Sequence, residues 1–268
     1  MKNCLIMGFG RSGTSLMGGI LHQAGYYMGE DLYPGRDSNP KGFFENALIN
    51  GINEKILKNY DYALSHPGHP ASGEPFSPYH PGEGHRWLAY IPLEVKITEE
   101  SEDIKEAIRK AVSYNGFAYK DPRFNYTLKI WAPFLNNETL LICVFRDPAI
   151  TVQSILTECE RAEYLSGFHI TKDLAEELWL YSYSHLFQNL KKFSSDQIIF
   201  VHYEKLLSGE ALPGLSRRLG IRLSDDFASP GLNRTTSGAP VGLKATTIYQ
   251  KLCNLADVRL NSTNFTSS

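Results

Sequence analysis

The sequence has few cysteines, no long apolar run and almost no net charge. Its 268 residues include four cysteines, and the formal net charge is -2. No Cys-x-x-Cys pair occurs, so we expect neither a disulfide framework nor a cysteine metal site, and we predict that Cys4 and Cys143 are buried thiols. The charge balance argues against nucleic-acid binding, which calls for a basic surface. No apolar run is long enough to span a membrane.

The first ten residues also lack the features of a secretory signal. They hold one lysine and a very short apolar stretch before the first glycines. We therefore expect no signal peptide and a cytoplasmic protein. Because neither an internal repeat nor a clear domain break is found, we expect one domain over residues 1–268. The sequence does not indicate an oligomeric state.

Short apolar runs alternate with amphipathic stretches along the chain. Residues 4–9, 117–120, 139–145 and 198–203 are predicted to be strands, because such bounded apolar runs suit a sheet buried on both faces. Residues 101–115 show the helical spacing i, i+3, i+4, i+7 and i+8. Strands that alternate with helices indicate a parallel sheet. The predicted fold is α/β, with a central parallel sheet between two layers of helices.

Residues 65–87 interrupt this pattern with many prolines and glycines. We expect a lid-like insertion, because long irregular segments in compact domains are often lids or binding loops. Its rings suit stacking on a sugar or an aromatic ligand, namely Phe76, Tyr79, His80 and Trp87. The segment also holds His66, His69, His80 and His85, whose spacing is not typical of metal ligands. We therefore expect solvated histidines and no metal site.

The stretch GFGRSGTSLM, which begins at Gly8, almost matches the phosphate loop G-x-x-x-x-G-K-[ST], but Thr14 stands in place of the lysine. Backbone amides at a helix start still attract an anion, and the planar guanidinium of Arg11 suits phosphate or sulfate. The alternative is a tight turn whose glycines serve packing alone. The residues predicted to bind the anion are Gly10, Arg11, Ser12, Gly13, Thr14 and Ser15.

A second arginine, Arg146, directly follows the strand predicted at 139–145. Ser154 stands eight residues later in a predicted helix. Ligands of α/β proteins lie at the carboxyl ends of strands, and arginine can bind phosphate through two hydrogen bonds. The alternative is that Arg146 pairs with Asp147 or Asp121, while Ser154 is plain helix surface.

Both stretches resemble sulfotransferases that use 3′-phosphoadenosine 5′-phosphosulfate (PAPS). In that family a loop like that around Arg11 holds the 5′-phosphosulfate, and an arginine and a serine placed like Arg146 and Ser154 hold the 3′-phosphate. KDPR at Lys120 resembles a segment whose lysine lies near the transferred group. VHYEKLL, which contains Tyr203, resembles a stretch after the last core strand. The resemblance spans about residues 4–207 and is closest to bacterial and carbohydrate-type members.

The resemblance implies a P-loop-like sulfotransferase fold and an enzyme that needs no metal. It would move the sulfuryl group of PAPS to a hydroxyl of a carbohydrate, lipid or small metabolite and release adenosine 3′,5′-bisphosphate. Arg11 and Lys120 would neutralise the developing negative charge. The cytosolic phenol-sulfating members have an arginine-lysine-glycine segment that is missing here, where GLNRTTSG offers only Arg234 as a nucleotide contact.

A general base must take the proton of the acceptor hydroxyl. In the heparan, trehalose and tyrosylprotein branches it is a glutamate after the loop helix, where this chain has Glu30 and Glu45. We favour Glu45, because the preceding residues 42–44 are apolar and are expected to raise its pKa towards neutrality. Alternatively, Glu45 caps the next helix or lies in water. Arg123 is predicted either to bind the acceptor or to pair with Asp121.

Two other functions are compatible with the glycine loop. A small-molecule or nucleotide kinase would need Mg²⁺, an acidic metal ligand and normally the loop lysine. A non-catalytic nucleotide-binding domain would need neither Glu30 nor Glu45. Arg146 and Ser154 favour the sulfotransferase over the kinase, because a kinase does not have to bind a 3′-phosphate.

Overall fold

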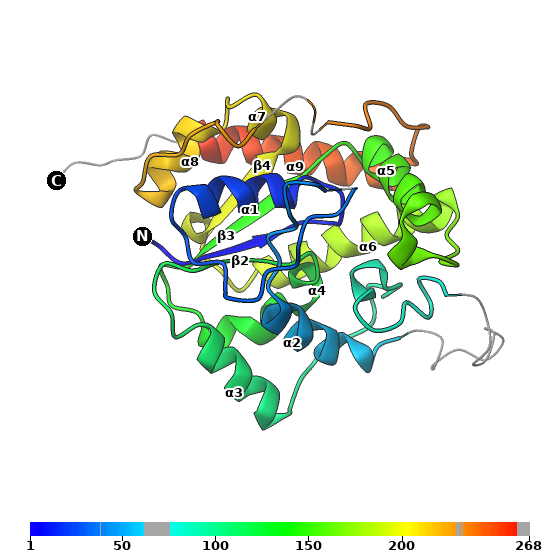
Figure 1. The fold of residues 1–268 in the computed structure, drawn as a ribbon, viewed down its shortest axis with the longest axis horizontal. Coiled ribbons are helices and arrows are strands. Elements are labelled where there is room, and N and C mark those ends of the chain that lie inside the picture. The colour runs from blue at the N-terminus through cyan, green and yellow to red at the C-terminus, as the bar shows by residue number, and fades with distance from the viewer. Residues whose placement is uncertain (38, 62–75, 229–230, 232, 262–268) are drawn as a thin grey trace.

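A computed structural model of the chain has a four-stranded parallel sheet covered by helices on both faces (Figure 1). It describes residues 1–37, 39–61, 76–228, 231 and 233–261, without the side chains of 258–261. The strands are β1 (Cys4–Met7), β2 (Ala118–Lys120), β3 (Leu140–Phe145) and β4 (Ile198–His202), in the order β2-β1-β3-β4. All three pairings are parallel. The predicted α/β fold is confirmed.

The helices of the described residues include those predicted at 101–115 and around Ser154. They are α1 (Thr14–Gln23), α2 (Ala47–Lys58), α3 (Glu102–Ala111), α4 (Phe124–Trp131), α5 (Pro148–Arg161), α6 (Lys172–Leu190), α7 (Tyr203–Leu207), α8 (Leu212–Leu219) and α9 (Leu243–Asn261). Short 3-10 turns are η2 (Arg86–Leu88), η3 (Ala132–Phe134), η4 (Glu163–Leu165) and η5 (Ser195–Gln197). No described helix is long and apolar enough to cross a bilayer.

The continuous apolar strands are explained by two separate cores, one on each face of the sheet. Side chains of Cys4 and Ile6 enter the core shared with α1, α7 and α8. Leu5 and Met7 enter the core shared with α2, α4, α6 and α9. Successive side chains of a strand point to opposite faces, so a strand with two covered faces is apolar along most of its length. The predicted buried thiols, Cys4 and Cys143, are confirmed.

Helix starts near the sheet are fixed by short polar side chains. Asn46 accepts a hydrogen bond from the amide of Ile49 at 3.2 Å and so caps α2. Asp147 accepts from the amide of Ala149 at 2.8 Å and caps α5, which begins with Pro148. The alternatives in which Glu45 caps α2 and Asp147 pairs with Arg146 are therefore wrong.

Candidate active site

One cavity of about 600 Å³ lies where the carboxyl ends of the strands meet. The loop after β1, the end of β2, and the residues that follow β3 and β4 all contribute to its lining. Edges of this kind are where α/β proteins bind ligands. Of the predicted site residues, the cavity brings together Gly10, Arg11, Gly13, Thr14, Ser15, Glu45, Lys120, Arg146, Ser154, Tyr203 and Arg234.

The glycine loop is shaped by two aromatic rings that pack directly on it. Gly13 has a φ of 91°, and a Cβ on it would overlap the ring of Tyr203. A Cβ on Gly10 would overlap the ring of Trp87, from the insertion. Glycine is required at both positions, because other residues carry a Cβ. The loop thus keeps its backbone close to the cavity at the start of α1, where amides attract anions.

Among the residues predicted to bind the anion, Gly10 to Ser15, only Ser12 is absent from the cavity lining. Its side chain is fully buried, and its Oγ accepts a hydrogen bond from the hydroxyl of Tyr183 at 3.2 Å. Its amide donates to the carbonyl of Phe9 at 3.2 Å. The expectation that the Ser12 hydroxyl binds the anion is therefore corrected: this hydroxyl is a core contact between the loop and α6.

Arg11 and Ser154 meet, although 143 positions separate them in the chain. The Nε of Arg11 donates to the Oγ of Ser154 at 3.2 Å, and its Nη1 lies 3.5 Å from Oε2 of Glu158. Ser154 is only 5% exposed, so the alternative in which it is plain helix surface is wrong. The two predicted anion motifs are neighbours across one part of the cavity.

Arg146 is buried and has no ion pair with Asp147 or Asp121 in the described structure. Its Nη2 donates to Oδ1 of Asn233 and to the carbonyl of Thr235. Its guanidinium lies 4.6 Å from the centre of the Tyr203 ring, a cation–π distance. Its Nε has no hydrogen-bond partner among the described residues but lies 3.6 Å from Oε1 of Glu204, with which it forms an ion pair. A buried guanidinium on a cavity wall whose hydrogen bonds are incomplete is suited to an anionic ligand.

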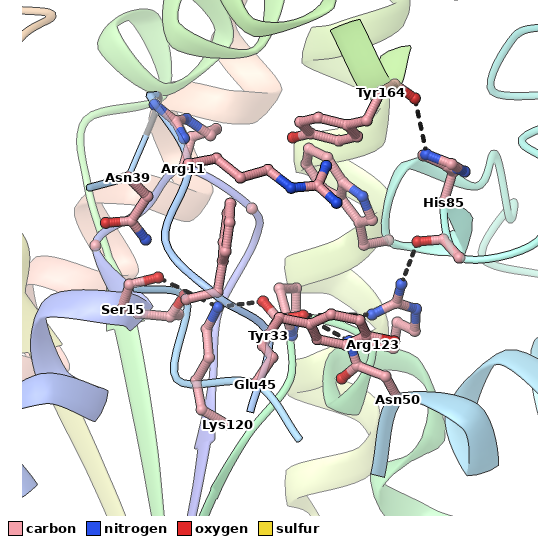
Figure 2. A pocket seen from close by; sticks show the side chains of 18 of the residues that line it. Arg11, Ser15, Tyr33, Asn39, Glu45, Asn50, His85, Lys120, Arg123 and Tyr164 are labelled. Atoms are coloured by element: carbon pink, nitrogen blue, oxygen red, sulfur yellow. Dashed lines mark hydrogen bonds and ion pairs between the residues drawn. The ribbon is translucent and has the colours of Figure 1, made fainter. Parts of the chain in front are cut away.

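Lys120 and Glu45 form a buried ion pair at the end of β2 (Figure 2). The Nζ of Lys120 donates to Oε1 of Glu45 and, at 3.4 Å, to Oγ of Ser15. The other carboxylate oxygen, Oε2, accepts from Nδ2 of Asn50 at 2.7 Å and lies 3.9 Å from Nη1 of Arg123. Both oxygens of Glu45 are therefore occupied by donors from the cavity wall.

The pKa expected for Glu45 is corrected by these contacts. Burial raises the pKa of its carboxyl, but the charges of Lys120 and Arg123 outweigh burial and hold the pKa below its ordinary value. The apolar residues 42–44 do not isolate the carboxylate, since it points at two cations. In this state Glu45 is ionised and closely paired.

Arg123 pairs with Asp121, one of its two predicted roles. Its Nη1 donates to Asp121 at 3.0 Å, its Nε donates to Glu54 at 2.5 Å, and its Nη2 donates to the carbonyl of Gly84 at 2.7 Å. Glu54 also accepts from Nη1 of Arg86 at 2.7 Å. This network joins α2, the residues after β2 and the end of the insertion in one wall.

Glu30 and Arg234 lie outside the centre of the site. Glu30 is exposed and is not part of the cavity lining, whereas Glu45 lines the cavity. Arg234 is exposed at the rim and donates to the carbonyl of Asp37. Arg234 belongs to the cavity lining, and its predicted nucleotide contact stays a prediction.

The insertion is described only from residue 76 onward, and there it forms part of the cavity wall. Residues 83–87 line the cavity. The ring of His85 stacks on Tyr164, and burial lowers the pKa of His85, so the prediction that it is a solvated histidine is wrong. His66 and His69 fall outside the described residues. Within the described ranges no cluster of three metal-ligating side chains occurs.

Sequence reasoning missed Asn50, Glu54 and Glu158 as site residues. Asn50 and Glu54 are four residues apart on the same face of α2, and Ser154 and Glu158 are four apart on α5. Residues with this spacing are neighbours on a helix surface. The spacing was visible in the sequence, but nothing there showed which helix face turns towards the cavity.

A family model described as the sulfotransferase family matches residues 4–224. The chain belongs to the sulfotransferase family. Transferase chemistry, and sulfuryl transfer in general, is therefore supported for it. A comparison with curated proteins gives no match.

Solved structures of sulfotransferases share the fold. This sulfotransferase-family chain is similar to the sulfotransferase domain of the Synechococcus PCC 7002 olefin synthase, with 14% identity, a TM-score of 0.54, and coverage of 94% of this chain and 96% of that chain. It is also similar to the sulfotransferase domain from the curacin biosynthetic pathway, with 12% identity, a TM-score of 0.52, and coverage of 94% of this chain and 97% of that chain. A Mycobacterium tuberculosis sulfotransferase is similar with 14% identity, a TM-score of 0.50, and coverage of 94% of this chain and 76% of that chain. At these identities the likeness concerns the fold.

Proposed function

We propose that the chain transfers the sulfuryl group of PAPS to a hydroxyl of a carbohydrate, lipid or small metabolite. The observation that carries the proposal is the meeting of three groups in one cavity. These are the glycine loop with Arg11, the buried Arg146 beside Ser154's helix, and the Lys120–Glu45 pair. A cytoplasmic location and a single domain over residues 1–268 stay predictions.

The residues present fit a donor with two anionic ends. The amides of the loop and the start of α1 suit the 5′-phosphosulfate, with Arg11 beside them. Arg146, whose Nε makes no hydrogen bond to the described residues, and the hydroxyl of Ser154 suit the 3′-phosphate. Tyr203, whose ring packs on both Gly13 and Arg146, fixes the spacing of the two ends. PAPS supplies the activated sulfuryl group.

In the proposed step the acceptor oxygen forms a bond to sulfur while the bond from sulfur to the 5′-phosphate oxygen breaks. The hydroxyl proton passes to Glu45, and the electron pair of the broken bond stays on the bisphosphate. Lys120, Arg11 and the loop amides neutralise the charge that builds there. No metal is needed to balance this step.

Glu45 must be released before it can act as a base. In the described state Lys120 holds Glu45 and also contacts Ser15 of the loop. An anionic donor on the loop competes with Glu45 for Lys120. Once Lys120 turns to the donor, the pKa of Glu45 rises, because a neighbouring cation no longer favours its charged form. Donor binding thus prepares the base.

The first test is thermal unfolding with adenosine 3′,5′-bisphosphate, compared with AMP and with ADP plus Mg²⁺. At one hundred times its dissociation constant a ligand stabilises the folded state by about 2.7 kcal/mol. For a chain of this size that raises Tm by about 5 to 10 °C. We expect this shift with the bisphosphate and its loss in Arg146→Ala.

A matched control for Arg146→Ala is Arg109→Ala, because Arg109 is exposed on α3 and is not part of the cavity lining. It should keep the full shift. A shift with ADP and Mg²⁺ alone would contradict the proposal and favour a kinase. A bisphosphate shift with no sulfuryl transfer to any acceptor would favour the non-catalytic nucleotide-binding domain.

A further inference from the structure

One face of α2 forms the side of the cavity that leads away from the Lys120–Glu45 pair. The α2 residues in the lining are Asn50, Gly51, Glu54, Lys55 and Lys58. These positions follow one helix face, and the span from Asn50 to Lys58 is about 12 Å at 1.5 Å per residue. Asn50 contacts Glu45, whereas Lys58 ends the helix.

Asn50 has an unpaired oxygen at the reacting end of this face (Figure 2). Its side chain is 5% exposed, and its Nδ2 donates to Glu45 at 2.7 Å. A carboxylate can accept a hydrogen bond from the side-chain nitrogen of Asn50 but not from its oxygen. The oxygen Oδ1 is therefore on the side of the amide group that does not contact Glu45. Oδ1 has no hydrogen-bond partner among the described residues. A buried carbonyl oxygen without a donor is unfavourable, and a polar ligand would satisfy it.

The next residue of this face, Gly51, has no side chain, so the helix backbone itself faces the cavity there. Glycine in a helix interior is less favourable than alanine, and here its backbone angles do not require it, since it is not among the residues with positive φ. A Cβ on Gly51 would meet no described atom within 4 Å outside its own helix. Packing against the described residues therefore does not explain the glycine, whereas a ligand lying against α2 would.

Two cations lie at the outer end of the face. Lys55 and Lys58 are exposed, and neither forms an ion pair with any of the described residues. Glu54 is already held by Arg86 and Arg123. Glu83, on the insertion, is the acidic side chain of the described lining that remains outside these pairs. The outer end of α2 therefore offers two positive charges to a ligand.

We propose that the acceptor lies along α2 and carries an anionic group, such as a carboxylate, phosphate or sulfate, about 12 Å from the hydroxyl that receives the sulfuryl group. Its hydroxyl end meets Glu45 and Asn50, its middle packs on Gly51, and its anionic end meets Lys55 and Lys58. This inference rests on the proposed sulfuryl transfer and adds the acceptor class.

The test uses ω-hydroxyalkanoates of graded chain length and their methyl esters, with radiolabelled PAPS as donor. We expect an optimum chain length, and at that length a kcat/KM roughly tenfold higher for the acid than for its ester, since paired charges discriminate by about that factor. In the double variant Lys55→Gln, Lys58→Gln the preference should disappear through a higher KM for the acid. Lys191→Gln, Lys192→Gln, which removes two exposed lysines outside the cavity, should keep it.

Gly51 supplies a second readout that a destabilised protein cannot imitate. Gly51→Ala should raise Tm by about 2 to 4 °C through helix propensity. Gly51→Leu should raise the acceptor KM at least several-fold while the bisphosphate still shifts Tm fully. If Gly51→Leu leaves acceptor KM unchanged, α2 does not bind the acceptor.

The outcomes separate this inference from the proposed function. Equal use of acid and ester, a preference that persists without both lysines, or transfer to none of these acids while the bisphosphate still binds would each overturn the anionic acceptor and leave the donor site standing. Failure of the bisphosphate to bind at all would instead contradict the proposed function.

Discussion

At the scale of single residues, the balance of charge around Glu45 controls the proposed chemistry. Lys120 is 3% exposed and contacts both the base and the loop through Ser15. Asn50 donates a hydrogen bond to the same carboxylate, and the guanidinium of Arg123 lies 3.9 Å from it. The apolar sequence before Glu45 predicted a raised pKa, but a nearby charge has more effect on a carboxylate than neighbours in the chain that point elsewhere. The role of Glu45 as the base stays a prediction, and its electrostatic setting could not be predicted from the sequence.

Removing Lys120 should therefore move the acid limb of the pH–rate profile. The kcat/KM profile reports groups of the free enzyme, where Lys120 holds the pKa of Glu45 low. In Lys120→Met that pKa rises, so the limb shifts to higher pH, and kcat falls because a charge-neutralising group is lost. The measurement is kcat/KM against pH for both proteins. An unchanged limb would show that Glu45 is not the titrating base.

Glu45→Gln is the companion variant. It should lower kcat by about 10²- to 10⁴-fold, the usual contribution of a general base, and the acid limb should vanish. The bisphosphate should still raise Tm, because the donor contacts proposed here do not include Glu45. Glu30→Gln serves as the control, since Glu30 is exposed and away from the cavity. Full activity of Glu45→Gln would contradict the assignment.

At the scale of elements, α5 carries both Ser154 and Glu158, and its start follows β3 directly. Pro148 and the Asp147 cap fix where the helix begins, so Ser154 reaches Arg11 of the loop after β1. The sequence predicted the helix that carries Ser154. It did not predict that Glu158 also reaches Arg11, because that contact depends on how α5 is rotated against the sheet.

Loss of the α5 cap should weaken the protein and the site together. Asp147→Ala should cost about 1 kcal/mol of stability, as is typical of a lost cap, or about 2 to 4 °C in Tm. The bisphosphate affinity should also fall, since α5 positions Ser154. Ser101→Ala removes the cap of α3, which does not line the cavity, and should lower Tm without affecting affinity. Equal affinity of Asp147→Ala and Ser101→Ala for the bisphosphate would contradict this role of α5.

At the scale of the whole molecule, buried ion pairs join three distant segments into the wall beside Glu45. Glu54 accepts from Arg86, Arg123 and the amides of Gly84 and Arg86. Through these bonds α2, the insertion and the residues after β2 hold one another. Burial raises the pKa of Glu54, but the two arginines outweigh burial and leave it below its ordinary value of 4.5.

This wall should make stability depend on pH. A carboxyl with a lowered folded-state pKa contributes its full stability above its ordinary value and loses it as the pH falls through the folded value. Burial raises the pKa of Asp121, so this carboxyl favours the folded state more as the pH falls, which opposes the effect of Glu54. We therefore compare Glu54→Gln with the parent by thermal unfolding from pH 7 to pH 3. The variant should be less stable at pH 7 by about 3 kcal/mol, and the difference should narrow below pH 4.5. A constant difference would exclude the ion pairs as its cause.

The sequence by itself determined the alternation of strands and helices, the glycine loop, and the residue types of the two anion motifs whose residues meet in the cavity. These are local properties: apolar runs, helix periodicity, glycine spacing and the arginine that follows β3. Only the tertiary structure decided that Ser12 faces the core, that Glu45 is paired with Lys120, and that one face of α2 lines the cavity. Such facts depend on helix rotation and on contacts between segments many residues apart, such as Arg123 with Glu54, which no local pattern specifies.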